Sequence, residues 1–552
     1  MKRLLPCFTP FITIIVLTQY TLCAQVLPLV QTVDFKKDTF NIVQYGAVAD
    51  GITLCTKSIN AAIEACNKKG GGIVWVPAGL WLSGPIVLKS NTNLHLAANA
   101  LLQFTTNFNE YALQEGNWEG VPAVRNQSPL SAKNAENIAI TGNGIIDGGG
   151  DAWRAVKKDK LTESQWKHLT ASGGLLSEDQ KTWYPSEKSF KGTRVKDAGV
   201  LKDGKTIKDF EDIKDYLRPN LLVFSNCKKI LLEGITFQNS PAWSLHPLMC
   251  EDVTVKKVYV KNPWYAQNSD GIDIESCKNV LLEDNTFDVG DDGICIKSGR
   301  DAEGRKRAMP TENVRVRHCI VYHAHGGFVI GSEMSGGARN ISVSDCSFIG
   351  TDVGLRFKTT RGRGGVVEKI FVDNINMKDI AGEAILFDMY YMAKDPVLLA
   401  GEKRELPKAE FIPVDETTPV FKNFRISNVY CNGAEKAIFI RGLPEMHIKD
   451  ILLQNMVLQA VKGMDIQEAS GLRFKNIKLI TTDTSPVIDL VQSDHILFDK
   501  IEYKDGADLL FRISGDRVSK IDIRHTDVSK AKEKWTVDAG ADEKQVTFTN
   551  IH

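Results

Sequence analysis

The stretch NSDGIDIESCKNVLLEDNTFDVGDDGICIKSG, residues 268–299, contains one five-residue pattern twice. Asp270-Gly-Ile-Asp-Ile is followed about one repeat later by Asp292-Gly-Ile-Cys-Ile. Apolar residues alternate in both copies, as in a strand with one face in a core. If the two copies stack, Asp270 and Asp292 face each other with Asp291 beside them. Like charges so close together are costly, so the stretch raises the possibility of a functional site as well as a fold.

Similar segments recur along most of the chain. A polar lead-in precedes an apolar-x-apolar segment in CKKILL, CEDVTV, CKNVLL, TENVRV, ARNISV and several later copies. Most copies are separated by about 22 to 29 residues, which is a period typical of β-solenoid coils. A second apolar alternation follows each copy, so every coil contributes at least two short strands. Because connections between parallel strands are overwhelmingly right-handed, the chain is predicted to be all-β, a single right-handed parallel β-helix.

The two ends and one internal region depart from the repeat. Helical spacing of apolar residues over residues 58–68 predicts a helix that covers the open end of the core. A charged stretch with several aromatic residues, 150–218, predicts an insertion folded over one end of a groove; a solvated loop is the alternative. The predicted organisation is a signal peptide at 1–24, a cap and first coils at 25–130, a catalytic β-helix at 131–530 and a C-terminal tail at 531–552.

The first residues are typical of a secretory signal, with Met-Lys-Arg followed by an apolar run. We therefore expect export to the periplasm or beyond the cell. Cys23 raises the alternative of a lipoprotein, although Leu22 before it is larger than the residue usual at such a cleavage site. No later apolar run approaches the length that spans a bilayer, so no membrane span is expected.

Composition excludes some classes of partner. Lys+Arg and Asp+Glu both number 68, so no net charge favours nucleic acid. The cysteines show no zinc-binding spacing, and those at one register position of successive coils are predicted to be stacked core thiols without chemistry. They are Cys227, Cys250 and Cys277 in one column, and Cys319 and Cys346 in another. We expect no cofactor and a monomer.

Alignment of the second strands places charged residues in columns on one face. Asp270 lies over Asp292, at the inter-strand spacing of about 4.7–4.9 Å. Asp291 takes the register of Ser269, and the next coil places His325 in that column.

One coil further, two cations join this face. Arg356 and Lys358 point outward because Leu355 and Phe357 must point inward. Turn chemistry would explain one Asp-Gly pair, and a solvated strand face would explain the cations. Neither explains three carboxylates, an imidazole and two cations converging, so an active site is favoured.

Crowded carboxylates push one another's proton affinities apart, so one can serve as an acid while another serves as a base. Glycoside hydrolysis needs this division of roles, and a wide separation of the two groups gives inversion. Arg356 and Lys358 suit an anionic sugar, because a guanidinium binds a carboxylate bidentately and an ammonium adds a point charge.

Four ordered segments, NSDGID, GDDGICIKSG, AHGGFVIGSE and GLRFKT, closely resemble the signature segments of the polygalacturonases, glycoside hydrolase family 28. The resemblance implies a right-handed parallel β-helix that hydrolyses pectic galacturonan with inversion and without a metal. The resemblance implies that Asp291 is the general acid and that Asp270 and Asp292 activate the water. His325 would keep the acid correctly protonated, and Asn268 would orient Asp270. Arg356 and Lys358 would bind the galacturonate carboxylate.

The departures from the family pattern are mild. Ser269 stands where Thr is common, Ala324 where Gly is usual and Phe357 where Ile is usual, and none removes a catalytic group. The family's tyrosine near the sugar corresponds to Tyr390 or Tyr391, where packing is the alternative.

His246 stands one coil before Asp270 and is predicted to face outward toward a neighbouring sugar, although a lone histidine is more often structural. The long insertion resembles those of exo-acting members, which release galacturonic acid from non-reducing ends. The alternatives are a rhamnogalacturonan hydrolase or galacturonidase of the same family, a calcium-dependent pectate lyase and a non-catalytic polysaccharide-binding solenoid.

Overall fold

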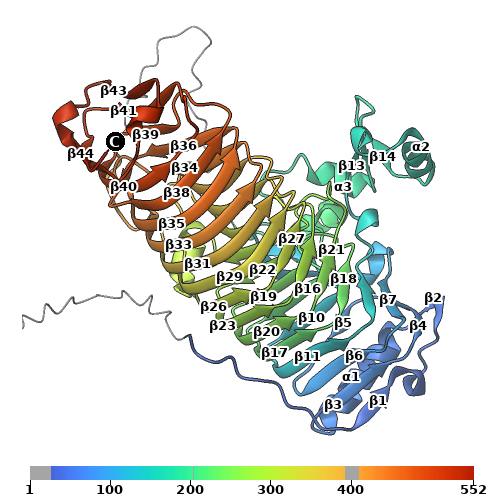
Figure 1. The fold of residues 1–552 in the computed structure, drawn as a ribbon. Helices are drawn as coiled ribbons and strands as arrows, with labels where there is room; N and C mark the ends of the chain where they lie inside the picture. The colour runs from blue at the N-terminus through green and yellow to red at the C-terminus, as the bar shows by residue number, and fades with distance from the viewer. Residues whose placement is uncertain (1–26, 203, 392–409, 552) are drawn as a thin grey trace, which may run out of the picture.

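The computed structural model describes residues 27–202, 204–391 and 410–551, and the proposed signal peptide lies outside them. Parallel strands wind into an elongated right-handed β-helix, whose coils follow one another from the N-terminal to the C-terminal end (Figure 1). Apolar side chains of all coils form one continuous core along its axis. None of the described helices is long and apolar enough to cross a membrane.

A sheet of 14 parallel strands forms one face of the solenoid and carries the predicted site. Successive strands pair in register, so each side chain lies in a column with its equivalents in neighbouring coils. The strands are β5 (Ile86–Val87), β10 (Leu130–Lys133), β16 (Leu222–Ser225), β19 (Leu245–Leu248), β22 (Ile272–Glu275), β25 (Ile294–Lys297), β28 (Gly326–Ile330), β30 (Val353–Lys358), β32 (Glu383–Asp388), β34 (Lys436–Arg441), β36 (Lys462–Gln467), β39 (Ile488–Val491), β41 (Leu509–Ser514) and β43 (Glu533–Asp538).

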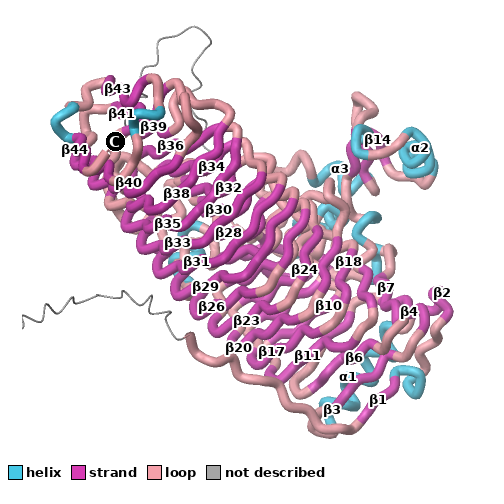
Figure 2. The backbone as a smooth tube through the Cα atoms, viewed as in Figure 1, coloured by secondary structure: helices cyan, strands magenta, loops and turns pink. Residues whose placement is uncertain are grey.

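The remaining faces form a second sheet of 25 strands, from β1 (Thr39–Asn41) to β44 (Val546–Thr549). This sheet covers two faces of the solenoid, because some of its strands are long enough to continue around the corner from one face to the next. β29 (Ala338–Ile349), for example, pairs with both β26 (Thr311–Arg317) and β27 (Ile320–Tyr322). Figure 2 shows how strands dominate the body and helices stay at its margins.

The helix α1 (Thr56–Lys68) lies at the N-terminal end of the core and packs against the first strands (Figure 1). It buries Ile59, Ala62, Ile63 and Cys66, the four residues whose spacing predicted it. The nine cysteines of the described chain are all buried and unbonded, which confirms the prediction of core thiols.

The solenoid continues further than predicted. Residues 531–552 were expected to be a tail, but β43 extends the 14-stranded sheet and β44 pairs with β42 (Ser519–Arg524). Trp535 and Phe548 stack at 4.0 Å against the end of the core. The prediction was wrong because these last strands are short and bounded by charged residues, so their alternation is weak.

The insertion has its own small elements. It contains β13 (Val156–Lys157), α2 (Glu163–Ala171), β14 (Leu175–Leu176), β15 (Thr182–Tyr184) and α3 (Glu187–Gly192), followed by a 3-10 segment, η5 (Ile207–Tyr216). The part around α2 stands away from the solenoid (Figures 1 and 2). The segment η5 packs on a β-hairpin of strands β8 (Leu113–Trp118) and β9 (Val121–Asn126).

Candidate active site

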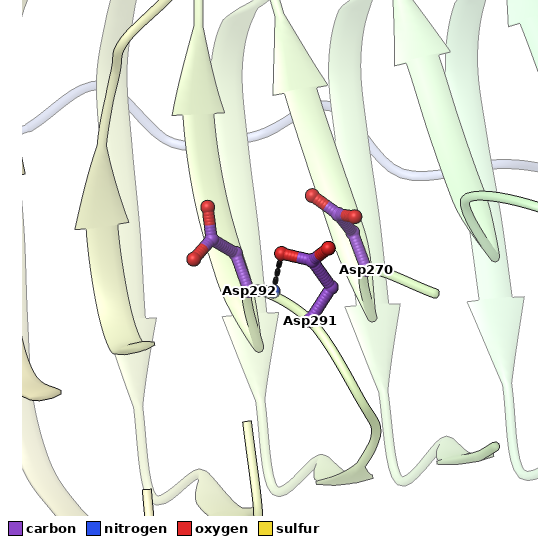
Figure 3. Close-up of side chains that lie close together, drawn as sticks. All are labelled: Asp270, Asp291 and Asp292. Carbon is purple, nitrogen blue, oxygen red and sulfur yellow. Dashed lines mark hydrogen bonds between the residues drawn. The ribbon is translucent and has the colours of Figure 1, made fainter. Parts of the chain in front are cut away.

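Three aspartates converge at the start of two neighbouring strands of the 14-stranded sheet (Figure 3). Asp270 precedes β22, and Asp291 and Asp292 precede β25. The register Ile272↔Ile294 places Asp270 beside Asp292, and the Gly271 N–H donates to the Asp292 carbonyl at 2.9 Å. One carboxylate oxygen of each aspartate lies within 4.8 Å of the others. The stacking predicted from the repeated pattern is therefore present.

The three carboxylates differ in access to solvent. Asp270 and Asp292 are 3% and 2% exposed, whereas the Asp291 side chain is 21% exposed. The Asp291 oxygens accept hydrogen bonds from the backbone N–H groups of Asn268 and Asp292, at 3.2 and 2.9 Å. Asp291 is thus oriented by backbone donors and is the most accessible of the three.

Asp292 is held as an anion by two cations. Its oxygens accept hydrogen bonds from Arg356 Nη1 at 3.1 Å and Lys358 Nζ at 2.8 Å. Burial opposes its ionisation, but Lys358 and Arg356 outweigh burial and hold the pKa of Asp292 well below its usual range. Breaking such a buried pair leaves an uncompensated charge, so removal of either cation is expected to destabilise the site.

Asp270 has the opposite environment. Burial, together with the neighbouring carboxylates of Asp273 and Asp291, raises its pKa well above the usual value. Its Oδ1 is buried and has no hydrogen-bond partner among the described residues. The two aspartates that the sequence makes equivalent are therefore electrostatically different.

His325 stands half-exposed at the rim of the cluster. Its Nδ1 lies 3.2 Å from Asp291 Oδ1, and its Nε2 lies 3.7 Å from Asp352 Oδ2. The hydrogen bond to Asp291 raises the pKa of His325 above its ordinary value of 6.5. The imidazolium can therefore supply a proton to Asp291 at pH values where a free histidine is neutral.

This pKa predicts a pH dependence. Because the histidine pKa is raised, the cation is present below pH 6.5 and is lost as the pH rises through the raised value. We expect kcat/KM to fall on the alkaline side in this range, and the fall to move or vanish in His325→Asn. The matched control is His323→Asn, an exposed histidine bonded to Asp288. An alkaline limb that is unchanged in His325→Asn and in the control alike would contradict this role.

The structure separates the two tyrosines. The Lys358 ammonium and the Arg356 guanidinium lie over the Tyr391 ring, at 4.9 and 5.9 Å from its centroid. Tyr390 lies beside Arg361 and Arg441 instead. Tyr391 is thus the member of the predicted pair that reaches the cations of the site.

Asn268 contacts different partners from those expected. Its side-chain oxygen accepts a hydrogen bond from Arg218 Nη2 at 2.9 Å, and its backbone N–H donates to Asp291. These contacts support Asp291 rather than Asp270. Arg218, at the end of the insertion, was not predicted, because a residue from an inserted loop has no register in the repeat.

His246 lies on the outer side of its strand, as predicted, but it is buried rather than exposed. The residue is 1% exposed; its Nε2 lies 2.9 Å from Glu275 and its Nδ1 lies 3.1 Å from Asn220. The hairpin β8–β9 covers this part of the sheet and leaves below it a cavity of about 540 Å³, which His246 lines. Alternation correctly placed His246 on the outer side of its strand, but the hairpin buries that side.

The hairpin crosses the sheet and is tied to a distant coil. Its turn, Glu119 and Gly120, has positive φ at both positions, as tight two-residue hairpins require. The Arg300 N–H donates to the Gly120 carbonyl, and Arg300 Nη1 lies 3.0 Å from Glu119. A side chain at Gly120 would come within 2.5 Å of the Arg300 nitrogen, so only glycine fits this contact.

Four side chains stack where the hairpin meets the sheet, and we name them the barrier stack. The Arg125 guanidinium lies 3.6 Å from the Trp118 ring centroid, Trp118 stacks on Trp243 at 5.6 Å, and Lys297 lies 4.8 Å from the Trp243 centroid. Trp243 occupies the register of Asp270 in the preceding coil, because Leu245 pairs with Ile272. The barrier stack therefore stands one coil, about 4.8 Å, from Asp270.

The site also contains three buried charges that were not predicted: Asp273, Lys297 and Glu333. They lie within the signature segments, and alternation turns Asp273 and Lys297 outward, so column alignment could have found those two; Glu333 lies in the loop after β28. Their significance lies in contacts between coils, which the separate segments do not reveal.

The donor set fits acid–base chemistry better than a metal. An acidic triad can attract a cation, but Arg356 and Lys358 already balance Asp292 at hydrogen-bond distance. A divalent ion would have to displace or lie against these two cations, which is electrostatically unfavourable.

Comparisons with known proteins place the chain in a family. Residues 192–403 match the glycosyl hydrolases family 28, and residues 39–201 match a family described as rhamnogalacturonase A/epimerase, pectate lyase-like. An exo-poly-alpha-D-galacturonosidase of Dickeya chrysanthemi is 28% identical over 79% of this chain and 70% of that protein.

Two solved structures cover most of the fold. An exopolygalacturonase of Yersinia enterocolitica covers 94% of this chain and 78% of its own, with a TM-score of 0.60 and 20% identity. A hyperthermoactive exopolygalacturonase of Thermotoga maritima is 31% identical, with a TM-score of 0.65 over 82% of this chain and 94% of its own. At this identity and coverage, the chain belongs to glycoside hydrolase family 28 and is a glycoside hydrolase.

Proposed function

We propose that this enzyme is an exo-acting polygalacturonase, which removes single galacturonic acid units from the non-reducing ends of α-1,4-linked galacturonan. The similar proteins from Dickeya and Thermotoga are named for exo action on galacturonan. Arg356 and Lys358, with Tyr391 beside them, suit a sugar that carries a carboxylate. The proposed signal at residues 1–24 would export the enzyme to its polymeric substrate.

The barrier stack is the observation that carries exo action. An enzyme that cuts inside a polymer needs a groove open on both sides of the cleavage point. Here Trp243 stands one coil from Asp270 and Trp118 stacks on it, so bulky side chains beside the carboxylates would stop the polymer on that side. The insertion supports this barrier indirectly, because η5 packs against the hairpin that carries Trp118.

The proposed reaction assigns one step to each carboxylate. Asp291 donates its proton to the glycosidic oxygen as the bond to the anomeric carbon breaks. A water between Asp270 and Asp292 gives its proton to one of these carboxylates and its oxygen to the anomeric carbon. The base then loses its proton to solvent, and Asp291 regains one through His325.

The stereochemistry of the product is a direct test of this scheme. Facing pairs of carboxyl groups in inverting enzymes are usually about 6.5–9.5 Å apart, and about 5 Å is usual for retaining enzymes. The closest oxygens here lie within 4.8 Å, but two carboxylates flank the water instead of one. We propose inversion, so proton NMR during early turnover should show the β-anomer of the released sugar first. Early α-anomer would overturn the water-attack scheme.

Product analysis tests the substrate and the direction of attack. Time courses on a galacturonate trimer, a long oligogalacturonide and a rhamnogalacturonan fragment should give monomeric galacturonic acid from the first time points on the two galacturonans. Preferred cleavage of the rhamnogalacturonan fragment would favour the alternative suggested by the match at residues 39–201. Unsaturated products abolished by a chelator would favour a lyase instead.

Opening the barrier should change the products. In Trp118→Ala the stack on Trp243 is lost, and the groove gains space on the non-reducing side. We expect intermediate-length fragments from a long oligogalacturonide, and an earlier fall in viscosity of polygalacturonate than with the parent. Trp118→Phe keeps an aromatic surface and is the control. Monomer alone from Trp118→Ala, at parental viscosity, would show that another element blocks the groove.

A further inference from the structure

The two water-flanking aspartates differ in their counter-charges. Asp292 has Arg356 and Lys358 at hydrogen-bond distance. Asp270 instead has a like charge beside it: of its charged neighbours, the Asp273 carboxylate in β22 contributes most to raising the pKa of Asp270. Both Asp273 oxygens and Asp270 Oδ1 are buried and have no hydrogen-bond partner among the described residues. Two carboxyl groups can share a hydrogen bond only when one of them carries a proton.

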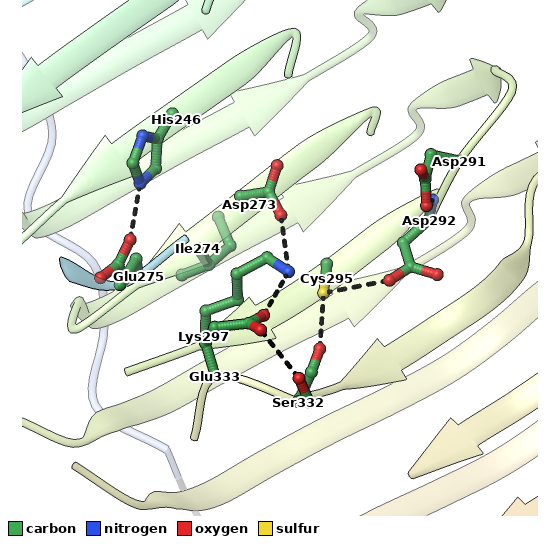
Figure 4. Close-up of polar contacts among 12 residues, drawn as sticks. His246, Asp273, Ile274, Glu275, Asp291, Asp292, Cys295, Lys297, Ser332 and Glu333 are labelled. Carbon is green, nitrogen blue, oxygen red and sulfur yellow. Dashed lines mark hydrogen bonds and ion pairs between the residues drawn. The ribbon is translucent and has the colours of Figure 1, made fainter. Parts of the chain in front are cut away.

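A buried lysine, Lys297, contacts the Asp273 member of this pair and lies between Asp273 and Glu333 (Figure 4). Lys297 Nζ lies 3.5 Å from Asp273 Oδ1 and 3.1 Å from Glu333 Oε2. Its side chain is 4% exposed and its Nζ lies 4.8 Å from the Trp243 ring centroid, so it is buried away from substrate. The lysine can act on the reaction only through the carboxylates that it contacts.

The charged groups that face this pair come from every neighbouring coil. Asp291, Asp292, Cys295 and Lys297 come from the coil of β25, and Glu333 comes from the loop after β28. Lys358 and Arg363 lie beyond Glu333, and the Arg363 guanidinium lies 3.7 Å from it. His246, from the preceding coil, and Arg307, from the helix α4 (Asp301–Arg307) after β25, are bound to Glu275 instead. Lys297 is thus the cation in direct contact with the pair.

We propose that Lys297 is a positioning residue, which gives the Asp270–Asp273 pair a single negative charge shared with one proton. This rests on the proposed function, since the ionised pair is the species that accepts a proton from water. The pair titrates as a unit, so the proton belongs to both groups. Burial raises the pKa of Asp273 to about 8; the Lys297 cation opposes this rise and the Asp292 anion adds to it. A raised pKa agrees with a retained proton.

Two substitutions should move the acid limb of the pH profile of kcat/KM in opposite directions. Lys297→Met removes the cation, so ionisation of the pair becomes harder and the limb should move up by about 1 to 3 pH units. Asp273→Asn removes the like charge and adds an amide donor, so the limb should move down. The control is Lys278→Met, an exposed lysine 3.6 Å from Glu312 on the other sheet.

Removal of Lys297 alone leaves Glu333 with less compensation, so this variant can fail to fold. Lys297→Met with Glu333→Gln removes both charges and should show the same upward shift. A purely structural role predicts lower activity at every pH with unchanged limbs. Limbs that stay at the parental pH in folded variants, or that move in the same direction in both substitutions, would overturn the proposal.

A spectroscopic readout separates this inference from the proposed function. Infrared difference spectra between pH 6 and pH 10 should show a carboxylic-acid band in the parent that is absent in Asp273→Asn. Absence of the band in a parent that hydrolyses oligogalacturonide overturns the shared proton alone. Absence of turnover on every uronic oligosaccharide, with the band present, overturns the proposed function alone.

Discussion

Asp291→Asn is expected to lower kcat by at least about 100-fold while the protein stays folded, because removal of a positioned general acid typically costs about 10²- to 10⁴-fold. The amide is nearly the same size, and it can keep a contact with the Asn268 N–H. It has no acidic proton to give the leaving oxygen. Release of reducing sugar from oligogalacturonide measures the loss, and thermal unfolding by circular dichroism checks the fold.

The leaving group offers a sharper version of this test. An aryl galacturonide leaves without protonation, so Asp291→Asn should lose much less activity on it than on the natural linkage. Asp284→Asn, a half-exposed aspartate paired with His318, is the matched control and should match the parent on both substrates. An equal loss on both substrates would assign Asp291 to another role.

Arg356→Met is expected to lower kcat/KM by about 30- to 5,000-fold. Truncation of one partner of a buried, hydrogen-bonded charge pair typically costs about 2–5 kcal/mol, and Arg356 bonds Asp292 at 3.1 Å. The substrate carboxylate would lose its guanidinium partner in the same change. Arg356→Lys should not restore activity, because an ammonium lacks the two parallel donors of the guanidinium.

The chemistry of the substrate separates these two contributions. If Arg356 binds the galacturonate carboxylate, the parent should prefer free acid over methyl ester, and Arg356→Met should lose most of that preference. Initial rates on de-esterified and fully esterified oligogalacturonides measure it. Arg339→Met, at an exposed arginine paired with Glu312, is the control. A preference that survives in Arg356→Met would leave Lys358 as the carboxylate ligand.

Much of the site followed from periodicity. Once Asp270 and Asp292 share a pattern, parallel strands at a fixed spacing must bring them together, and the same register brings Asp291 under His325. Arg356 and Lys358 point outward because Leu355 and Phe357 are core residues. These are local consequences of strand alternation, so a single sequence was enough to predict them.

The environment of each charge did not follow from periodicity. Identical Asp-Gly-Ile patterns hold Asp292, which is ion-paired with two cations, and Asp270, whose strongest charged neighbour is another carboxylate. Proton affinity depends on burial and on charges that arrive from other coils. Lys297 is 24 residues from Asp273, yet it contacts that residue through the stacking of β22 and β25.

The closure of the groove came from outside the repeat. His246 was expected at the surface, and Trp118 was not assigned any role, because a hairpin has no fixed register relative to the coils it covers. Glu119 and Arg300 meet although 181 residues separate them. Strand alternation is a short-range steric property that can be read along the chain, whereas the buried charges and the barrier stack depend on contacts between distant segments, which exist only in the folded protein.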